Sequence, residues 1–182
     1  MSGIVGSYFN TRGSGIVAKL GTDGQVFTSS GAGVSQDFEA AAGGGKVLQV
    51  IPGTLTSEFS TVSTTFVETG LTCAITPSST SSKILILVTG AMADTQTDGF
   101  NYVATIYRDA TNLGDADYGF AYLRVDNDAM AACVAVNYLD EPSSVSEIDY
   151  KLCIKGGGGA GETAYFARND ATAIMTVMEI GA

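Results

Sequence analysis

The clearest structural signal in the chain is the stretch Glu147-Ile148-Asp149-Tyr150-Lys151-Leu152-Cys153-Ile154-Lys155. Its apolar residues recur at every second position, beginning at Ile148, and charged residues occupy most of the positions between them. In an extended strand these two sets point to opposite faces. The stretch therefore predicts a β-strand with one buried face and one face in water.

A second informative stretch runs from Lys83 to Val88 and is apolar after its first residue, which is typical of a strand covered on both faces. Further strand-like segments occupy 46–51, 55–67, 71–75, 100–108, 118–125, 130–138, 162–167 and 173–180. Turn residues separate them, and no segment carries a convincing helical period. Roughly nine or ten short strands predict an all-β domain over residues 46–182, either a β-sandwich or a jelly roll.

Residues 1–45 have a different texture, rich in Gly, Ser and Ala without a sustained period. Such a segment cannot bury enough apolar area alone to offset its ordering entropy. We therefore expect an extended docking arm that ends in a Gly-rich linker, with one or two helical turns possible at 36–42. The expected contact points with another protein are its apolar pairs, Ile16 with Val17 and Val26 with Phe27.

The charge balance excludes several partners. The net charge is −10, with 9 basic residues against 19 acidic ones, and no basic run occurs, so nucleic acid is not an expected partner. No signal-peptide pattern is visible, and the longest strongly apolar stretch, Ile84 to Val88, is too short to span a bilayer. We expect a soluble product without membrane insertion.

Nothing in the chain predicts catalysis or a cofactor. Histidine is absent, which removes the usual nucleophile–base pairs and imidazole metal ligands. The cysteines Cys73, Cys133 and Cys153 lie in strand-like runs without a CxxC pair, so we expect buried reduced thiols and folding in a reducing cytoplasm. The Gly-rich run before Lys46 lacks the residues of a phosphate-binding loop.

Paired carboxylates are the remaining chemical candidates. They occur at Asp94 and Asp98, at Asp115 and Asp117, and at Asp126 and Asp128. A Ca²⁺ site needs several oxygen ligands converging on one point, and none of these pairs matches a known loop pattern. Solvated loop carboxylates are the expectation, with a Ca²⁺ ligand as the alternative. Glycoside hydrolysis by two carboxylates is disfavoured because nothing places them across a cleft.

One N-terminal motif resembles a known family. The segment from Leu20 to Gly33 reads LGTDGQVFTSSGAG. It resembles a short repeat near the start of phage tail-fibre and related virion proteins, whose usual form is G-x-x-G-Q-V-L-T-S-x-G-x-G. Phe27 replaces the common Leu, which exchanges one apolar residue for another. The resemblance implies that the arm docks onto other virion proteins.

Other segments resemble a domain of marine phage structural proteins: Thr64–Leu71, Ile75–Ile86 and, for its last strand, Ala173–Ile180. That domain is similar in length and strand number to the trimeric jelly roll of C1q and TNF. The resemblance implies a jelly-roll β-sandwich that forms a trimeric knob, and it implies no catalytic residues. A trimer needs an inner sheet covered on both faces, and we assign its contacts to Ile84, Ile86, Val88, Met175 and Val177.

Three functional hypotheses follow. The first is a virion structural protein of a tail fibre or spike, assembled in the host cytoplasm as a homotrimer with its arm on the particle. The alternative is a head fibre or a capsid decoration protein with the same fold. The third hypothesis adds that the knob binds a host cell-surface glycan or protein, through exposed tyrosines and the loops at 94–100 and 156–161.

Overall fold

A computed structural model describes residues 25–28, 37–40, 46–94, 100–125, 131–156 and 163–181. The chain divides into two units between Gly44 and Gly45, and each is described by itself. Among the described residues, none forms a helix long and apolar enough to cross a membrane.

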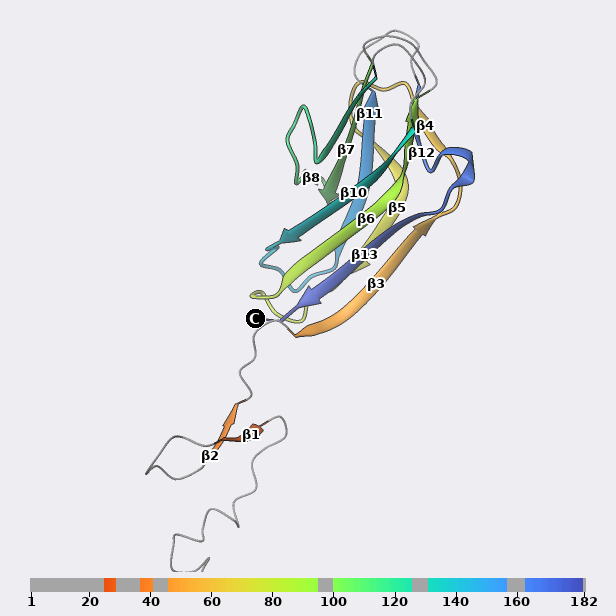
Figure 1. The fold of residues 1–182 in the computed structure, drawn as a ribbon. Helices are drawn as coiled ribbons and strands as arrows, with labels where there is room; N and C mark the ends of the chain where they lie inside the picture. The colour runs from red at the N-terminus through yellow and green to blue at the C-terminus, as the bar shows by residue number, and fades with distance from the viewer. Residues whose placement is uncertain are drawn as a thin grey trace, which may run out of the picture. The chain divides into compact units, whose positions relative to one another are not determined.

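The described part of the first unit is a two-stranded antiparallel pairing. Strand β1 (Gln25–Thr28) pairs with β2 (Asp37–Ala40), with Val26 opposite Glu39 and Phe27 opposite Phe38 (Figure 1). Residues 37–40 form a strand, so the helical turns considered for 36–42 are wrong for these four residues. Val26 and Phe27 lie in β1, whereas Ile16 and Val17 lie outside the described residues. The docking role of all four stays a prediction.

The second unit is built almost entirely from strands. They are β3 (Val47–Leu55), β4 (Phe59–Thr61), β5 (Val67–Ile75), β6 (Lys83–Asp94), β7 (Phe100–Arg108), β8 (Thr111–Asn112), β9 (Ala121–Val125), β10 (Ala131–Asp140), β11 (Ile148–Gly156), β12 (Ala164–Phe166) and β13 (Ala173–Ile180). One short 3₁₀ turn, η1 (Arg168–Asp170), lies between β12 and β13.

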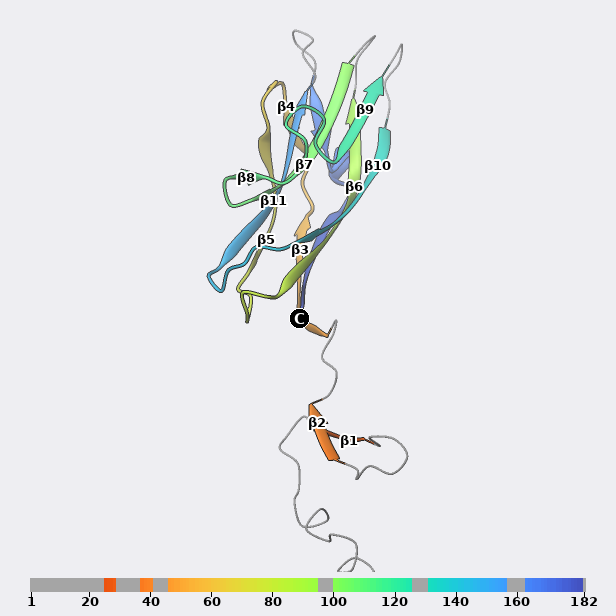
Figure 2. The ribbon, with the colours of Figure 1, turned by 90° about the vertical axis from the view of Figure 1, so that its left-hand side faces the viewer.

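These strands form two antiparallel sheets that face each other (Figures 1 and 2). One sheet, here the β6 sheet, has the order β3-β13-β6-β10, and β12 and β4 continue it beside the far end of β6. The other, here the β11 sheet, has the order β5-β11-β7-β9, with β8 also beside β7. Counting the eight longer strands along the chain gives 1-8-3-6 and 2-7-4-5, which is the jelly-roll order. The all-β sandwich prediction is confirmed.

The strand predicted from 147–155 is confirmed as β11. Ile148, Tyr150, Leu152 and Ile154 are buried, and the charged residues between them are half-exposed. The apolar run of β6 is covered on one face within a single chain, and coverage of its other face by neighbouring copies stays a prediction. Ile84, Ile86 and Val88 are buried, but Leu87 keeps 36% of its surface exposed, so a single chain covers only one face of this run.

The core lies between the inner faces of the two sheets. Its largest buried side chains include Tyr102, Tyr150, Phe166, Ile106 and Leu152. Gly90 in β6 lies directly under the ring of Phe166, and a methyl group at this position would collide with that ring and with Ala173. Close packing of this kind is what two interlocking sheet faces require.

A buried carboxylate joins three segments at the end of the sandwich where β3 begins. Glu179 in β13 accepts hydrogen bonds from Gln49 Nε2 at 2.6 Å, from the Ser78 N–H at 2.7 Å and from the Ser78 hydroxyl at 2.6 Å. Gln49 lies in β3, and Ser78 lies in the turn between β5 and β6. Burial by itself raises the pKa of Glu179, but the hydrogen bonds outweigh it and lower the pKa to about 2.

This carboxylate should make stability depend on pH below its ordinary pKa of 4.5. Because the folded pKa is depressed, the stabilisation is complete above pH 4.5 and is lost as the pH falls towards 2. Urea unfolding of the wild type and of Glu179→Gln should therefore show a difference in free energy that is constant near neutrality and shrinks below pH 4.5. Glu147→Gln, at an exposed position, is the matched control. A Glu179→Gln difference that stays constant down to pH 2 would contradict this account.

Candidate functional site

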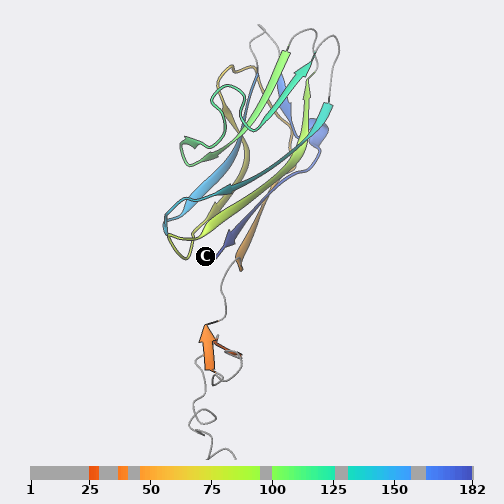
Figure 3. The ribbon, with the colours of Figure 1, turned by 60° about the vertical axis from the view of Figure 1, so that its left-hand side comes forward.

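The four long strands of the β6 sheet, β3, β13, β6 and β10, lie side by side (Figure 3). Their registers place three rows of uncharged side chains on the outer face of this sheet. The rows are Leu139-Leu85-Met178-Val50, then Asn137-Leu87-Thr176-Pro52, then Ala135-Thr89-Ile174-Thr54. We call this surface the apolar face. The exposed fractions of its large residues are 53% for Val50, 47% for Leu139, 43% for Ile174 and 36% for Leu87. Eight of these twelve side chains are apolar and the other four are Thr or Asn. An uncharged and largely apolar patch is typical of an interaction surface.

Charged side chains lie at the margin of the apolar face. Lys83, at the start of β6, lies beside this face and pairs with Glu141 at 2.6 Å. Both side chains are well exposed, so this ion pair contributes little to stability.

The outer face of the β11 sheet is polar and aromatic instead. It contains a shallow hollow of about 620 Å³, lined by Phe66, Glu68, Tyr107, Asp109, Asp149 and Lys151, among others. The Phe66 and Tyr107 rings meet edge to face, with centroids 6.1 Å apart. The Lys151 ammonium lies 2.9 Å from Glu68 Oε1 and 3.6 Å from Asp149 Oδ2, so its charge is matched inside the hollow.

A smaller hollow of about 310 Å³ lies on the same sheet, with Asn101, Tyr118, Tyr122 and Lys155 in its lining. The two tyrosine rings are 5.3 Å apart, and the Tyr122 hydroxyl donates a hydrogen bond to Asn101 Oδ1 at 2.5 Å. Lys155 also reaches Phe66, with Nζ 4.5 Å from the ring centroid. The Phe66–Lys155 pair therefore connects the two hollows.

The floor of the larger hollow has no activated nucleophile. Cys153 lies there, and burial together with the nearby Glu68 carboxylate raises the pKa of its thiol to about 12. Burial also raises the pKa of Tyr107. Both groups keep their protons near neutral pH, and only the thiolate form of cysteine is a nucleophile.

The carboxylate pairs provide no metal site within the described residues. Asp115 accepts the N–H groups of Tyr118 and Asp117, each at 2.8 Å, and these bonds lower its pKa. Its role there is to close the loop. No group of three or more Asp, Glu, Cys or His side chains that could hold a metal occurs in the described part of the chain. Asp98, Asp126, Asp128 and the side chain of Asp94 lie outside the described residues.

A buried polar triad links the two sheets. Arg108 Nη1 in β7 donates to both carboxylate oxygens of Asp140 in β10, at 2.9 and 3.0 Å. The Tyr150 hydroxyl in β11 donates to Asp140 Oδ2 at 2.6 Å. Burial raises the pKa of Tyr150, and the bond to Asp140 adds to this rise. The phenol therefore remains a donor, and the triad is a structural cross-link between the two sheets.

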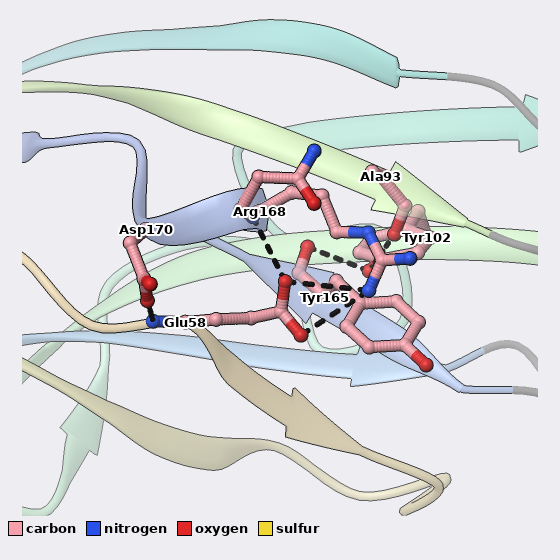
Figure 4. A network of polar contacts seen from close by, with 7 residues as sticks. Glu58, Ala93, Tyr102, Tyr165, Arg168 and Asp170 are labelled. Carbon is pink, nitrogen blue, oxygen red and sulfur yellow. Dashed lines mark hydrogen bonds and ion pairs between the residues drawn. The ribbon is translucent and has the colours of Figure 1, made fainter.

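A second network holds the corner between β12 and β13 (Figure 4). The Glu58 carboxylate lies 3.2 and 3.3 Å from Arg168 Nη1 and accepts the Asn169 N–H at 2.9 Å, while the Glu58 N–H donates to Asp170 Oδ1 at 3.0 Å. The Arg168 guanidinium lies over the Tyr165 ring at 3.9 Å.

This corner has an unusual backbone, because Ala167, Asn169 and Asp170 all have positive φ angles, between 53° and 58°. Such conformations are costly for residues other than glycine. The contacts of Glu58 hold the corner in this conformation, and no feature of the network indicates a ligand.

The five residues assigned from the sequence to a trimer interface lie elsewhere. Ile84, Ile86, Val88, Met175 and Val177 are all buried in the core of one chain, with at most 1% of their surface exposed. They contact the opposite sheet and cannot meet a neighbouring copy. A contact through this sheet uses the residues that alternate with them, such as Leu87 and Ile174. The alternation of residues along each strand correctly separated its two faces. It did not show which of the two faces packs into the core.

Two of the three cysteines are buried as predicted, and the third is exposed. Cys73 and Cys153 are buried, as predicted, and burial raises the pKa of Cys73 to about 11. Cys133 is exposed in β10, contrary to the prediction. All three thiols are free.

No protein-family model and no curated protein matches the chain. Solved structures similar to it include the T13 particle of infectious bursal disease virus (TM-score 0.40, 12% identity, 85% of this chain and 42% of that one). They also include the Gx strain of this virus (0.40, 12%, 86% and 45%) and its VP2 subviral particle (0.37, 14%, 87% and 42%). The chain thus spans less than half the length of these proteins. The assignment of the jelly roll rests on the chain's own strand order.

Removing the cation of the buried triad should be costly. Arg108→Met leaves Asp140 buried without its charged partner and should lower the free energy of unfolding by about 3–5 kcal/mol. Adding Asp140→Asn removes the unpaired charge and should restore part of the loss. Lys83→Met, which breaks an exposed pair, is the control and should cost less than about 1 kcal/mol. Equal losses for Arg108→Met and Lys83→Met in urea unfolding would show that the triad is not a cross-link.

Proposed function

We propose that the chain is a structural protein of a phage particle, in which three copies associate through the apolar faces of their β6 sheets. The observation that carries the proposal is the apolar face itself: four strands of a well-ordered sheet present three uncharged rows to solvent. The jelly-roll order and the N-terminal motif at 20–33 support the assignment to a virion.

The distribution of charge favours further copies of the same chain as the occupant of this face. With a net charge of −10, copies repel one another wherever acidic groups meet. Glu68, Asp109 and Asp149 instead line the outer side of the other sheet. A basic partner would find no counter-charge on the apolar face, whereas an identical uncharged face is complementary to it.

The energy available is consistent with a stable assembly. Val50, Leu87, Leu139 and Ile174 are already about half-covered, so completing the burial of each contributes about 1 kcal/mol. In a closed ring of three, each subunit contributes its own four side chains to the total. Three copies are proposed because the domain resembles the trimeric C1q and TNF jelly roll.

The N-terminal segment provides the attachment. Residues 1–45 dock onto other virion proteins through Ile16, Val17, Val26 and Phe27, and the last two lie in a paired strand. The knob is then presented on a tail fibre or spike, with the host surface as its target. A head fibre or capsid decoration protein is the second candidate, because it uses the same attached segment and the same trimer.

The stoichiometry is tested by sedimentation of the full chain at micromolar concentration. The expected mass is that of three copies of 18.7 kDa. Leu87→Asp and Ile174→Asp place charge on the apolar face and should give folded monomers, with the far-ultraviolet circular dichroism of the wild type. Thr72→Asp, exposed on the other sheet, is the matched control and should remain trimeric. A wild-type monomer would overturn the trimer.

The location is tested in purified particles. Cross-linking followed by mass spectrometry should join residues 1–45 to tail proteins, and deletion of these residues should yield particles without the knob. Cross-links to capsid subunits instead would establish the decoration protein. Absence of the chain from purified particles would overturn the virion role altogether.

A further inference from the structure

We infer that the outer face of the β11 sheet binds a neutral oligosaccharide that lies along β11, over both hollows. The inference rests on the proposed function for its biological meaning, since it names the ligand class that a displayed knob would recognise. The binding surface itself lies within one chain.

The larger hollow offers the two kinds of contact that a sugar uses. The Phe66 and Tyr107 rings provide apolar surface for the C–H face of a pyranose ring. Glu68, Asp149 and Lys151 provide acceptors and donors for its hydroxyl groups, and the Lys151 ammonium lies 2.9 Å from Glu68 and 3.6 Å from Asp149. Binding sites commonly combine aromatic walls with a few fixed polar groups in this way.

The arrangement of the hollows favours a chain over a single sugar. Lys151 and Lys155 belong to one hollow each and lie four residues apart on β11, a distance of about 13 Å along the strand. Phe66 lies between them, since it lines the larger hollow and contacts Lys155. Val103 in β7 lies opposite both Lys155 in β11 and Tyr122 in β9, so the residues of the smaller hollow come from neighbouring strands, although Val103 itself is buried. A ligand that bridges both hollows therefore has to be several units long.

Charge and topology disfavour other ligands. A free cation would compete with Lys151, which already holds Glu68 and Asp149, and an anion would meet three carboxylates in the larger hollow. A peptide added as a strand needs a free sheet edge, but β11 is paired on both sides, with β5 and β7. A neutral hydroxyl-rich chain requires neither a counter-charge nor a free edge.

The test is titration of the full chain with neutral tetrasaccharides, namely maltotetraose, cellotetraose and chitotetraose, followed by calorimetry and by aromatic NMR shifts. At least one probe should bind saturably and shift the ring signals of Phe66 and Tyr107. Tyr107→Ala should weaken that binding about tenfold or more, the factor that about 1.4 kcal/mol represents. Tyr107→Phe keeps the ring, so it should bind nearly as the wild type does and shows that the fold is intact.

The monomeric Leu87→Asp variant separates this inference from the trimer. It should bind the same tetrasaccharide, because the hollows belong to one chain, and a failed trimer would leave the sugar result unaffected. No binding of any probe at millimolar concentration would overturn the inference, as would affinity unchanged in both Tyr107→Ala and Phe66→Ala.

Discussion

Contact between the inner faces of the two sheets is the constraint on which the rest of the structure depends. Each sheet can bury only one side against the other, so every strand has to divide its residues between core and surface. Ile86 and Val177 meet the opposite sheet, whereas Leu87 and Thr176, one position away, point outwards. The outer faces of both sheets therefore remain exposed to solvent. The outer face of the β6 sheet is uncharged, whereas that of the β11 sheet carries charged and aromatic side chains.

Buried polar contacts fix how the two sheets sit on each other. Arg108, Asp140 and Tyr150 tie β7 and β11 to β10, and Glu179 ties β13 to β3 and to the turn before β6. Apolar packing alone is non-directional and tolerates sliding. A hydrogen bond to a buried charge has one geometry, and breaking it leaves a desolvated group. Apolar packing in the core thus holds the two sheets together, and the buried polar contacts fix their position relative to each other.

The two outer faces are suited to different kinds of partner. The β6 sheet presents uncharged rows suited to identical neighbours, while the β11 sheet places its aromatic rings among paired charges. An assembly through the first leaves the second turned outwards, available to a ligand. The outer face of the β6 sheet lacks charge and that of the β11 sheet carries it, as the proposed self-association of a strongly acidic chain requires.

The sequence by itself determined the strands, because a period of two is a local property: β11 follows from its alternation alone, and so does the all-β class. The same pattern left open which face of an apolar strand is inside, and so it misassigned Ile86 and placed Cys133 in the core. Only the tertiary structure decided the jelly-roll order and the meeting of Arg108 with Asp140 or Phe66 with Lys155. These contacts join residues far apart in the chain, and their register depends on the packing of all strands together.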